Sequence, residues 1–479
     1  IAACKIQDDE QVVSLANNIS VFETEVLLYP SFENSTKHYA VNSKAKKLLI
    51  NSNDGADIFI NGKKLGNSEV ILDISKKTYD DSIIITFTKT NLIETYYVHV
   101  IDESIPNIDV EVFGENIDDG FLIFSTNYNY NNSIDGVLFI VNNDGVPVFR
   151  RKVSGRVTDF KQHSNGMYSY ASRKPTKNSF GFWENEIVIL DNKLNEVKRV
   201  EVKGLSHTDN HDFLITDNSY ILLSYHSNYR DLSNQGLSTN ELTRDSVIQE
   251  ISSTTGDVIL EWNSYDHMNI NDCLIHRFPD DYAHVNSISL DSDNNIIASF
   301  RGCSTVLKIS RKTGNVIWSA GGSDPTLKIV DDPYEEFCGQ HTANVSSNGF
   351  LTIFDNGGHC NGDRESNHGR FSRALKYKID MNNQILKFHS HYLLNNSTEF
   401  YSKSGGSFFE LRNGNWLVNW ARGINFGMTE IDPNSMSIIF SIKTTNTDKK
   451  LITNYRINRI YDNIKIPLNL DNQTVFLNI

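Results

Sequence analysis

The sequence predicts an all-β protein: a small β-sandwich followed by a six-bladed β-propeller. Helical periodicity is almost absent, whereas short alternating runs of β-branched and aromatic residues, separated by Asn-Gly and Asp-Gly turns, continue from end to end. The chain has 479 residues, more than one ordinary domain holds unless that domain is a barrel, a propeller or a solenoid. Hydrophobic residues make up 39% of it, which is enough for a sizeable core and excludes global disorder.

The first part of the chain has the pattern of a compact sandwich of short strands. After an N-terminal segment of residues 1–21, residues 22–104 contain strand-like runs such as KKLLINS from Lys46 and SIIITFT from Ser82. The runs HYAV from His38 and YYVHV from Tyr96 resemble the cadherin-like β-sandwich family found on secreted multidomain proteins. The following segment DESIPNID, residues 102–109, is typical of a linker.

Residues 110–465 repeat, and the repeat predicts the propeller. An aliphatic strand, a turn and a second strand recur, as in GVLFIVNNDGVPVF from Gly136 and TVLKISRKTGNVIW from Thr305. A different hairpin alternates with this one, as in DFLITDNSYILLSY from Asp212. Two hairpins make a four-stranded sheet, and six such sheets over about 350 residues make a six-bladed propeller. Seven blades are the alternative if two repeats have been merged, and residues 466–479 form a C-terminal tail.

Charge and hydropathy exclude two classes of function. The formal net charge is -14 with a pI near 5.5, and an acidic surface repels phosphate backbones, so we expect no nucleic-acid partner. The longest aliphatic stretches, such as residues 137–141, are far shorter than the ~20 residues that a spanning helix needs. We therefore expect no membrane span.

The cysteines favour a secreted protein in an oxidising compartment, and the sequons permit a glycosylated one. The chain begins at Ile1, which we interpret as the product of signal-peptide removal. The five cysteines show no zinc-type spacing, and four of them fall close enough together for one or two disulfides: Cys273, Cys303, Cys338 and Cys360. Cys4 is the odd one out, either free or bonded to another chain in an oligomer or filament. Candidate glycosylation sequons begin at Asn18, Asn34, Asn131, Asn344, Asn395, Asn396 and Asn472, about as many as chance gives in so Asn-rich a chain.

Three histidines share one position in successive repeats. His211, His284 and His341 each lie four residues before an aliphatic residue of the inner hairpin, namely Ile215, Ile288 and Val345. Because the innermost strands of a propeller line its central channel, this offset brings the three imidazoles together at one mouth of the channel. Arg301 ends the strand that begins after His284, so it belongs to the same cluster.

Three histidines and an arginine suit the transfer of an anionic group better than a metal site. Three histidines can bind catalytic zinc, but Arg301 beside a dication is unfavourable and no carboxylate shares the offset. We therefore expect no metal and no cofactor. An arginine fork and several histidine donors instead match an oxyanion whose charge is spread over three oxygens, and a neutral histidine can attack it.

The strings that carry these residues resemble the arylsulfotransferases that work without a nucleotide sulfate donor. They are DNHDF from Asp209, AHVNSI from Ala283, SFRG from Ser299, GQHTA from Gly339, TGNVIWSAGG from Thr313, FDNG from Phe354 and SRALKY from Ser372. The resemblance implies a six-bladed propeller behind a small β-sandwich. It also implies that His341 becomes transiently sulfated, while His284, His211 and Arg301 hold the sulfuryl group and handle the phenol proton.

Residues beside these motifs have two interpretations each. Asn286 either orients His284 or donates to sulfate, or else it caps the strand entry. Arg373 either contacts substrate or forms a salt bridge between blades. Cys338 and Cys360 bracket His341 and pair in one arrangement, with Cys273 bonded to Cys303, but the sequence does not exclude the other two pairings.

The sequence thus predicts an aryl sulfotransferase that takes a phenolic sulfate donor and a phenol acceptor through a covalent sulfohistidine. The alternative is a non-catalytic extracellular structural, filament or adhesion protein built on the same propeller, in which the histidines are idle or bind sulfated ligands.

Overall fold

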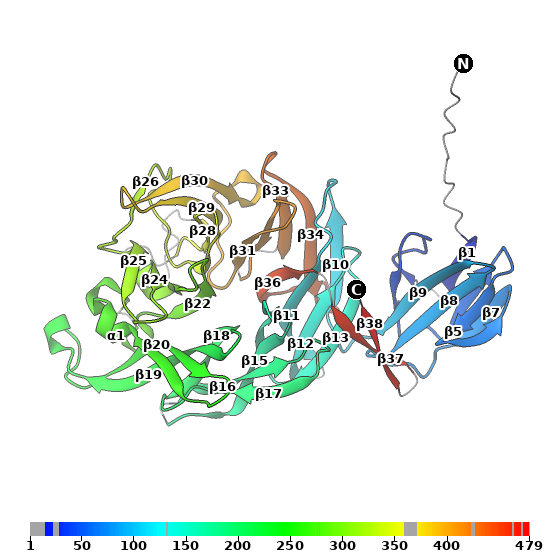
Figure 1. Cartoon of the computed structure of the whole chain (residues 1–479), viewed down its shortest axis with the longest axis horizontal. Coiled ribbons are helices and arrows are strands. Elements are labelled where there is room, and N and C mark those ends of the chain that lie inside the picture. The colour runs from blue at the N-terminus through cyan, green and yellow to red at the C-terminus, as the bar shows by residue number, and fades with distance from the viewer. Residues whose placement is uncertain are drawn as a thin grey trace, which may run out of the picture. The chain divides into compact units, whose positions relative to one another are not determined.

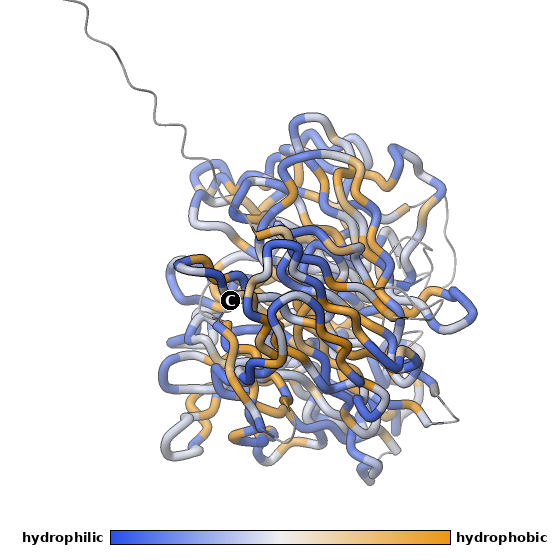
Figure 2. The backbone as a smooth tube through the Cα atoms, turned by 90° about the vertical axis from the view of Figure 1, so that its right-hand side faces the viewer, coloured by the Kyte–Doolittle hydropathy of each residue, from blue (hydrophilic) through white to orange (hydrophobic). Residues whose placement is uncertain are grey.

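The computed structural model describes residues 15–22, 28–130, 133–179, 181–274, 276, 278–358, 371–422, 427–461, 464–470 and 473–478. These residues form two compact units. The first comprises residues 1–105, 146–148 and 467–477, and the second comprises residues 106–145, 149–466 and 478–479. Hydrophobic and hydrophilic stretches alternate along the backbone, and many of the outer bends are hydrophilic (Figure 2).

The first unit is a β-sandwich. One sheet has the order β1-β4-β7 and the other β2-β3-β9-β8-β5-β6. The strands are β1 (Asn17–Val21), β2 (Leu28–Tyr29), β3 (His38–Asn42), β4 (Lys47–Ser52), β5 (Asp57–Ile60), β6 (Lys63–Gly66), β7 (Glu69–Asp73), β8 (Ser82–Lys89) and β9 (Leu92–Ile101). Alternating residues of both sheets, such as Leu48, Ile50, Ile85 and Val98, are buried in one core. A hairpin of β37 (Lys465–Leu470) and β38 (Gln473–Asn478) contributes residues 467–477 to this unit, while the likeness of the sandwich to the cadherin-like family stays a prediction.

The described residues of the second unit form six sheets, which are the blades of a propeller; their strands pair antiparallel apart from the short β26, which pairs with β30 in parallel. Blade 1 contains β36 (Asn454–Ile460), β11 (Phe121–Tyr130), β12 (Ser133–Val141) and β13 (Pro147–Ser154); blade 2 contains β14 (Val157–Gln162), β15 (Tyr168–Lys177), β16 (Trp183–Leu190) and β17 (Glu196–Val200); blade 3 contains β18 (His207–Ile215), β19 (Ser219–Arg230), β20 (Glu241–Ser252) and β21 (Val258–Asn263). Blade 4 contains β22 (Val285–Leu290), β23 (Ile296–Phe300), β24 (Thr305–Ile309) and β25 (Val316–Gly321); blade 5 contains β27 (His341–Val345), β28 (Phe350–Asp355), β29 (Arg373–Asp380), β30 (Ile385–Leu393) and the short β26 (Lys328–Val330); blade 6 contains β31 (Ser407–Glu410), β32 (Trp416–Asn419), β33 (Met428–Asp432), β34 (Ser437–Thr445), β10 (Asn107–Val112) and the short β35 (Leu451–Ile452). The prediction of an all-β fold with a six-bladed propeller is confirmed.

The first and last strands of the propeller sequence each pair with a strand from the opposite end of that sequence. β36, near the C-terminal end, pairs with β11 as the innermost strand of blade 1, and β10 pairs with β34 as an outer strand of blade 6. Figure 1 shows the red β36 beside the cyan β11. These two pairings close the ring of blades non-covalently, because each one links strands more than 300 residues apart.

Apolar side chains pack between neighbouring blades. Ile221 of blade 3 shares a core cluster with Val285 and Ile296 of blade 4, and Ile297 of blade 4 shares one with Leu351 of blade 5. The hairpin turns that the sequence predicted place Gly at a positive φ, as at Gly166 (+78°) and Gly349 (+74°), where a side chain would be strained. The repeated interfaces make a rigid support for the loops at the two mouths of the channel.

Short helices occur only between strands among the described residues. They are α1 (Ser264–His267), η1 (Ser233–Gln235), η2 (Ile270–Asp272), η3 (Pro279–Asp281), η4 (Arg301–Cys303) and η6 (Leu394–Asn396). Within the described ranges, no helix has the length and hydrophobicity that a membrane-spanning helix requires.

Candidate active site

The three histidines and Arg301 line one cavity. Its volume is about 390 Å³. His211 lies on β18, His284 immediately precedes β22, His341 is the first residue of β27, and Arg301 follows β23 as the first residue of η4. Blades 3, 4 and 5 therefore each contribute one imidazole, as their common offset in the sequence suggested.

Irregular strand pairing directs these side chains into the cavity. The register between the first and second strands shifts between Thr208 and Phe213 in blade 3 and between His341 and Asn344 in blade 5. His284 has a φ of +50°, a left-handed conformation that is uncommon outside glycine. A bulge of this kind turns the local backbone and re-aims a side chain, which explains how the inner strands present histidines at one mouth.

Gly302 allows Arg301 to approach His284. The N–H of Arg301 donates to the carbonyl of His284 at 3.0 Å, so this turn packs directly against the segment before β22. A Cβ on Gly302 would lie 2.0 Å from the carbonyl oxygen of Tyr282, which is backbone and has little freedom to move. The glycine of the SFRG string is therefore needed for the close approach that places Arg301 in the cavity.

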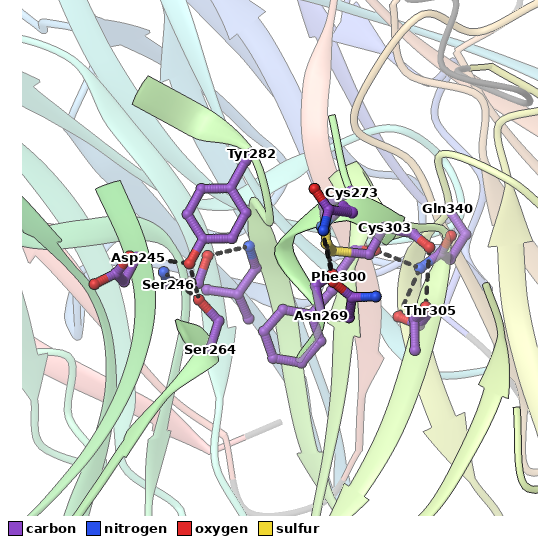
Figure 3. The surroundings of a disulfide bond; sticks show 12 residues. Asp245, Ser246, Ser264, Asn269, Cys273, Tyr282, Phe300, Cys303, Thr305 and Gln340 are labelled. Atoms are coloured by element: carbon purple, nitrogen blue, oxygen red, sulfur yellow. Dashed lines mark hydrogen bonds between the residues drawn. A yellow bond between two sulfur atoms is a disulfide. The ribbon is translucent and has the colours of Figure 1, made fainter. Parts of the chain in front are cut away.

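A disulfide braces the same turn. Cys303, the last residue of η4, is bonded to Cys273, which follows η2. Figure 3 shows Gln340 beside this disulfide. Its side-chain amide donates to the carbonyls of Phe300 and Thr305 at 3.4 and 3.1 Å, so the residue before His341 is tied to both sides of the Arg301 turn.

His341 is held in one neutral tautomer. Its Nδ1 lies 2.7 Å from Oδ1 of Asn356, whose amide nitrogen donates to the carbonyls of Ser402 and Gly405 at 2.9 and 3.1 Å. Those two carbonyls fix the amide orientation, so Oδ1 must accept and Nδ1 of His341 must carry the hydrogen. Nε2 therefore has the lone pair, and it accepts the N–H of Gly405 at 3.1 Å.

Electrostatics keep His341 unprotonated. Its side chain is only 2% exposed, and burial together with the charge of Arg301 holds its pKa well below the ordinary value. A buried, neutral imidazole with a defined lone pair is the form in which histidine acts as a nucleophile.

His211 and His284 have carboxylate partners instead. Nδ1 of His211 lies 2.7 Å from Oδ1 of Asp209, and Nδ1 of His284 lies 2.8 Å from Oδ2 of Asp281. The two rings meet edge to face with centroids 4.8 Å apart. In each dyad the carboxylate orients the ring and leaves Nε2 as the nitrogen that is available toward the cavity.

The two dyads differ in protonation. Burial lowers the pKa of His211, but the Asp209 carboxylate outweighs it, and the pKa lies above the ordinary value. At His284 burial prevails over Asp281, and the neighbouring His211 and Arg301 lower the pKa further. Because two adjacent imidazoles titrate as a coupled pair, the first proton that this pair binds resides mainly on His211.

The cavity is cationic. Arg156, Arg173 and Arg422 line it together with Arg301, and no Asp or Glu side chain is among the described residues that line it. Arg301 is nearly buried and donates to the carbonyl of Lys403 at 2.9 Å. A cavity of this size, lined by four arginines and by no acidic side chain among the described residues, suits a small organic anion.

A layer of ion pairs divides the channel beneath the histidines. Consecutive residues of the inner strands face opposite sides. Thr158, His211, His341 and Tyr455 line the histidine cavity, whereas Asp159, Asp212, Thr342 and Arg456 line a second cavity. Arg456 bridges Asp159 and Asp212 at 2.8 and 3.0 Å, and Lys161 contacts both carboxylates. Asp212 is therefore committed to this layer and not to a proton relay with His211.

Asn286 and Arg373 lie outside the cavity, in spite of their position in the motifs. The Asn286 amide is buried and donates to the carbonyl of Gln340 at 2.7 Å. Arg373 is 1% exposed and forms ion pairs with Asp332 and Asp355, both at 2.8 Å. Since Asp355 also accepts the N–H of Cys338 at 3.0 Å, Arg373 supports the loop that carries His341 rather than contacting a substrate there.

The remaining predicted sites are cysteines and sequon asparagines, which differ in bonding and in exposure. Cys338 is disulfide-bonded, while Cys360 and Cys4 lie outside the described residues. Asn18, Asn395 and Asn396 are exposed and Asn34 is half-buried, whereas Asn131 and Asn472 lie outside the described residues. The side-chain nitrogen of Asn344, to which a glycan would attach, is buried in β27, so the structure argues against this residue as an acceptor.

Several site residues were missed by the sequence reasoning. Asp209 and Asp281 lie two and three residues before their histidines, a spacing that signals a partner only when the local turn is known. Gly405 and Tyr455 come from distant parts of the chain; the Tyr455 ring lies edge-on to His211 and His341, with centroids 5.6 and 6.1 Å away. Nothing in the sequence around Gly405 and Tyr455 marks them as site residues. They reach the site only because the ring of blades closes.

No group of three or more His, Cys, Asp or Glu side chains in the described part of the chain is arranged to hold a metal ion. The histidine cluster itself pairs each imidazole with an amide or a carboxylate through Nδ1, as in the contacts above.

Comparison with known proteins identifies the family. Among solved structures, similar folds include a protein of unknown function from Bacteroides caccae (11% identity, TM-score 0.43, 71% of this chain and 98% of that one). A streptogramin B lyase is also similar (12% identity, TM-score 0.38, 74% of this chain and 98% of that one). So is a hydrazine synthase from Kuenenia stuttgartiensis (11% identity, TM-score 0.36, 86% of this chain and 96% of that one). We draw no functional conclusion from similarities with TM-scores this low. No curated protein matches the chain. The profile of the arylsulfotransferase (ASST) family, however, matches residues 115–456, which include all four cavity residues that the sequence singled out. The chain therefore belongs to the arylsulfotransferase family, and this membership supports aryl sulfotransferase activity in general.

Proposed function

We propose that this protein transfers a sulfuryl group from an aryl sulfate to a second phenol in two displacements, through a sulfohistidine at His341. The observation that carries the proposal is the difference between the partners of the three imidazoles. An amide holds His341, whereas carboxylates hold His211 and His284. The amide leaves His341 neutral with its lone pair on Nε2, and the carboxylate favours a proton on His211.

In the first displacement, Nε2 of His341 forms a bond to sulfur as the bond from sulfur to the aryl oxygen breaks. The aryl oxygen takes the electron pair of the broken bond and receives a proton from His211. Arg301 neutralises charge on the sulfuryl oxygens. The N–H of Gly405 now points at Nε2 and must leave it as sulfur approaches, after which it is available to donate to a sulfuryl oxygen.

In the second displacement, the acceptor phenol gives its proton to the now neutral His211, and its oxygen attacks sulfur while the bond from nitrogen to sulfur breaks. The sulfated ring of His341 is cationic, because Nδ1 keeps its hydrogen and donates to Asn356. A neutral amide stabilises this ring without cancelling its charge, so the ring remains a good leaving group. The same residue donates and recovers the proton, as microscopic reversibility requires of a symmetric exchange.

We further propose that the protein works in an oxidising, extracytoplasmic compartment. The disulfide between Cys273 and Cys303 and the bonded state of Cys338 support this location, because structural disulfides persist where thiols are not kept reduced.

The test uses 4-nitrophenyl sulfate as donor, with and without added phenol. We expect phenol-dependent release of nitrophenolate by the wild type and none by His341→Ala. Mass spectrometry of the wild type with donor alone should find one SO3 group on the peptide that contains His341. His163→Ala is the matched control, since His163 is also buried with a depressed pKa but lines the second cavity. Folded wild type that turns over none of a panel of aryl sulfates would favour the structural or adhesion alternative.

A further inference from the structure

The half of the cavity that faces the histidines carries three more arginines. His211, His284 and His341 belong to blades 3, 4 and 5. Arg156 immediately precedes β14 and Arg173 lies on β15 of blade 2, whereas Arg422 follows β32 of blade 6. Blade 1 lies between blades 2 and 6, because β36 closes the ring there. In a ring of six, these arginines therefore stand across the mouth from the histidines.

These arginines lack the acidic partners that other arginines of the chain have. Ion pairs hold Arg199, Arg230, Arg311, Arg373, Arg456 and Arg459. Among the described residues, neither Arg156, Arg173 nor Arg422 has a carboxylate within ion-pair distance, and no acidic residue lines their cavity. The chain has 59 acidic against 45 basic residues, so acidic partners are plentiful elsewhere. The absence of acidic side chains among the described residues beside these three arginines favours a ligand that supplies the negative charge.

Arg173 is a partly buried cation whose hydrogen bonding is incomplete among the described residues. It is half-buried, and its Nε is buried with no hydrogen-bond partner among the described residues. Burial, followed by the charge of Arg156, lowers the pKa of its guanidinium group. Two neighbouring cations in a partly desolvated place repel each other, and an anion that accepts hydrogen bonds from both removes the repulsion and completes the missing contacts.

We propose, resting on the sulfotransferase function above, that these arginines form a second anion subsite and that the preferred substrates are aromatic sulfates with a further carboxylate or sulfate group. The ester sulfate is held by the histidines and Arg301, and the ring extends across the mouth. The second anion then reaches Arg156 and Arg173, with Arg422 on the other side of blade 1. A cavity of about 390 Å³ lies at the small end of ligand pockets and suits one substituted aromatic ring.

Binding of uncleavable ligands tests the subsite separately from catalysis. Calorimetric titration compares benzenesulfonate, with one anionic group, and 4-sulfobenzoate, with two. We expect the wild type to bind 4-sulfobenzoate about tenfold more tightly, as one charge-assisted hydrogen-bonded contact implies. The double variant Arg156→Gln, Arg173→Gln should lose this preference, because its affinity for 4-sulfobenzoate falls about tenfold more than its affinity for benzenesulfonate. Arg199→Gln removes one positive charge from a surface ion pair, as single Arg156→Gln does from the cavity, and should keep the preference.

Two results would overturn the subsite: equal or undetectable binding of both ligands by the wild type, or a preference that survives in the double variant. Single Arg156→Gln, at an exposed position, provides a milder variant if the double variant unfolds. In an active enzyme, the double variant should raise KM for 4-carboxyphenyl sulfate about tenfold more than it raises KM for phenyl sulfate. A wild type that shows the binding preference without any turnover would keep the subsite and refute the sulfotransferase function.

Discussion

Replacement of Asp209 by Asn isolates the carboxylate that sets the charge of His211. In the wild type, this carboxylate lies 2.7 Å from Nδ1 of His211 and outweighs the effect of burial, so that the pKa of His211 is raised. An asparagine of the same shape still accepts a hydrogen bond but carries no charge. Burial then prevails and the pKa of His211 falls, so that less of the acid that the proposed mechanism requires is present at neutral pH.

The size of the effect follows from the contact. A hydrogen bond to a charged group contributes about 1.5–3 kcal/mol, and one pKa unit corresponds to about 1.4 kcal/mol. The His211 side chain is 21% exposed, so we take the lower end, about 1.5 kcal/mol. His211 of the variant therefore needs a lower pH to reach the same protonated fraction. The basic limb of the kcat/KM profile should move to lower pH, with an approximately tenfold loss on that limb and little loss at acidic pH.

Phenyl sulfate is the substrate for this assay, because phenol has a pKa near 10, like that of tyrosine, and needs a proton to leave. Chromatography measures phenol release and aryl sulfate formation with 4-methylphenol as acceptor across the pH range. Asp281→Asn is the matched control, since Asp281 holds the neighbouring His284, and it should shift the basic limb less. A loss in Asp209→Asn that does not vary with pH, or an equal shift in both variants, would refute the assignment of the acid.

Three further substitutions test the support of the site by their effect on the free energy of unfolding. Gly302→Ala places a Cβ 2.0 Å from the carbonyl of Tyr282 and should cost about 3 kcal/mol in urea unfolding, so an unchanged midpoint would contradict the close approach. Cys273→Ser combined with Cys303→Ser opens a loop with a sequence separation of 30 and should cost about 3.5 kcal/mol. Equal stability of this variant and the wild type without reductant would argue against a bracing role. Arg456→Met leaves two buried carboxylates with less compensation and should cost about 3–5 kcal/mol, and a neutral result would show that Lys161 suffices.

The fold was accessible from the sequence because its signals are local and repeated. Each hairpin alternates apolar and polar residues, and turns such as those at Gly166 and Gly349 occur at regular intervals. The exchange of strands at the ends was not accessible. Nothing local in residues 454–460 distinguishes them from the other inner strands, and their pairing with β11 is decided by the requirement that the ring close.

The site was accessible only in part, for the same reason. The common offset of the three histidines is a repeat signal, and it led to residues that share a cavity. Arg373, in contrast, lies in a string that equally resembles the family, but it forms ion pairs with Asp332 and Asp355. A basic residue beside a motif is available to a substrate only if no acidic side chain forms an ion pair with it. Sequence spacing does not show which acidic residues lie close to it in the folded protein. Hence the arginines of the second subsite, which have no motif at all, emerge only from the cavity.

The protonation of the cluster depends on which part of a blade supplies the partner of each histidine. Asp209 lies two residues before His211 on the same strand, β18, and Asp281 ends η3 three residues before His284. Asn356 follows the second strand of blade 5 and is fixed by carbonyls of Ser402 and Gly405, in the segment that leads into blade 6. The amide thus links His341 to the segment before the next blade as well as setting its tautomer, whereas each carboxylate comes from within three residues of its own histidine. One repeated scaffold therefore gives equivalent histidines different charges, and an exchange that needs one neutral nucleophile and one proton donor becomes feasible at a single mouth of the channel.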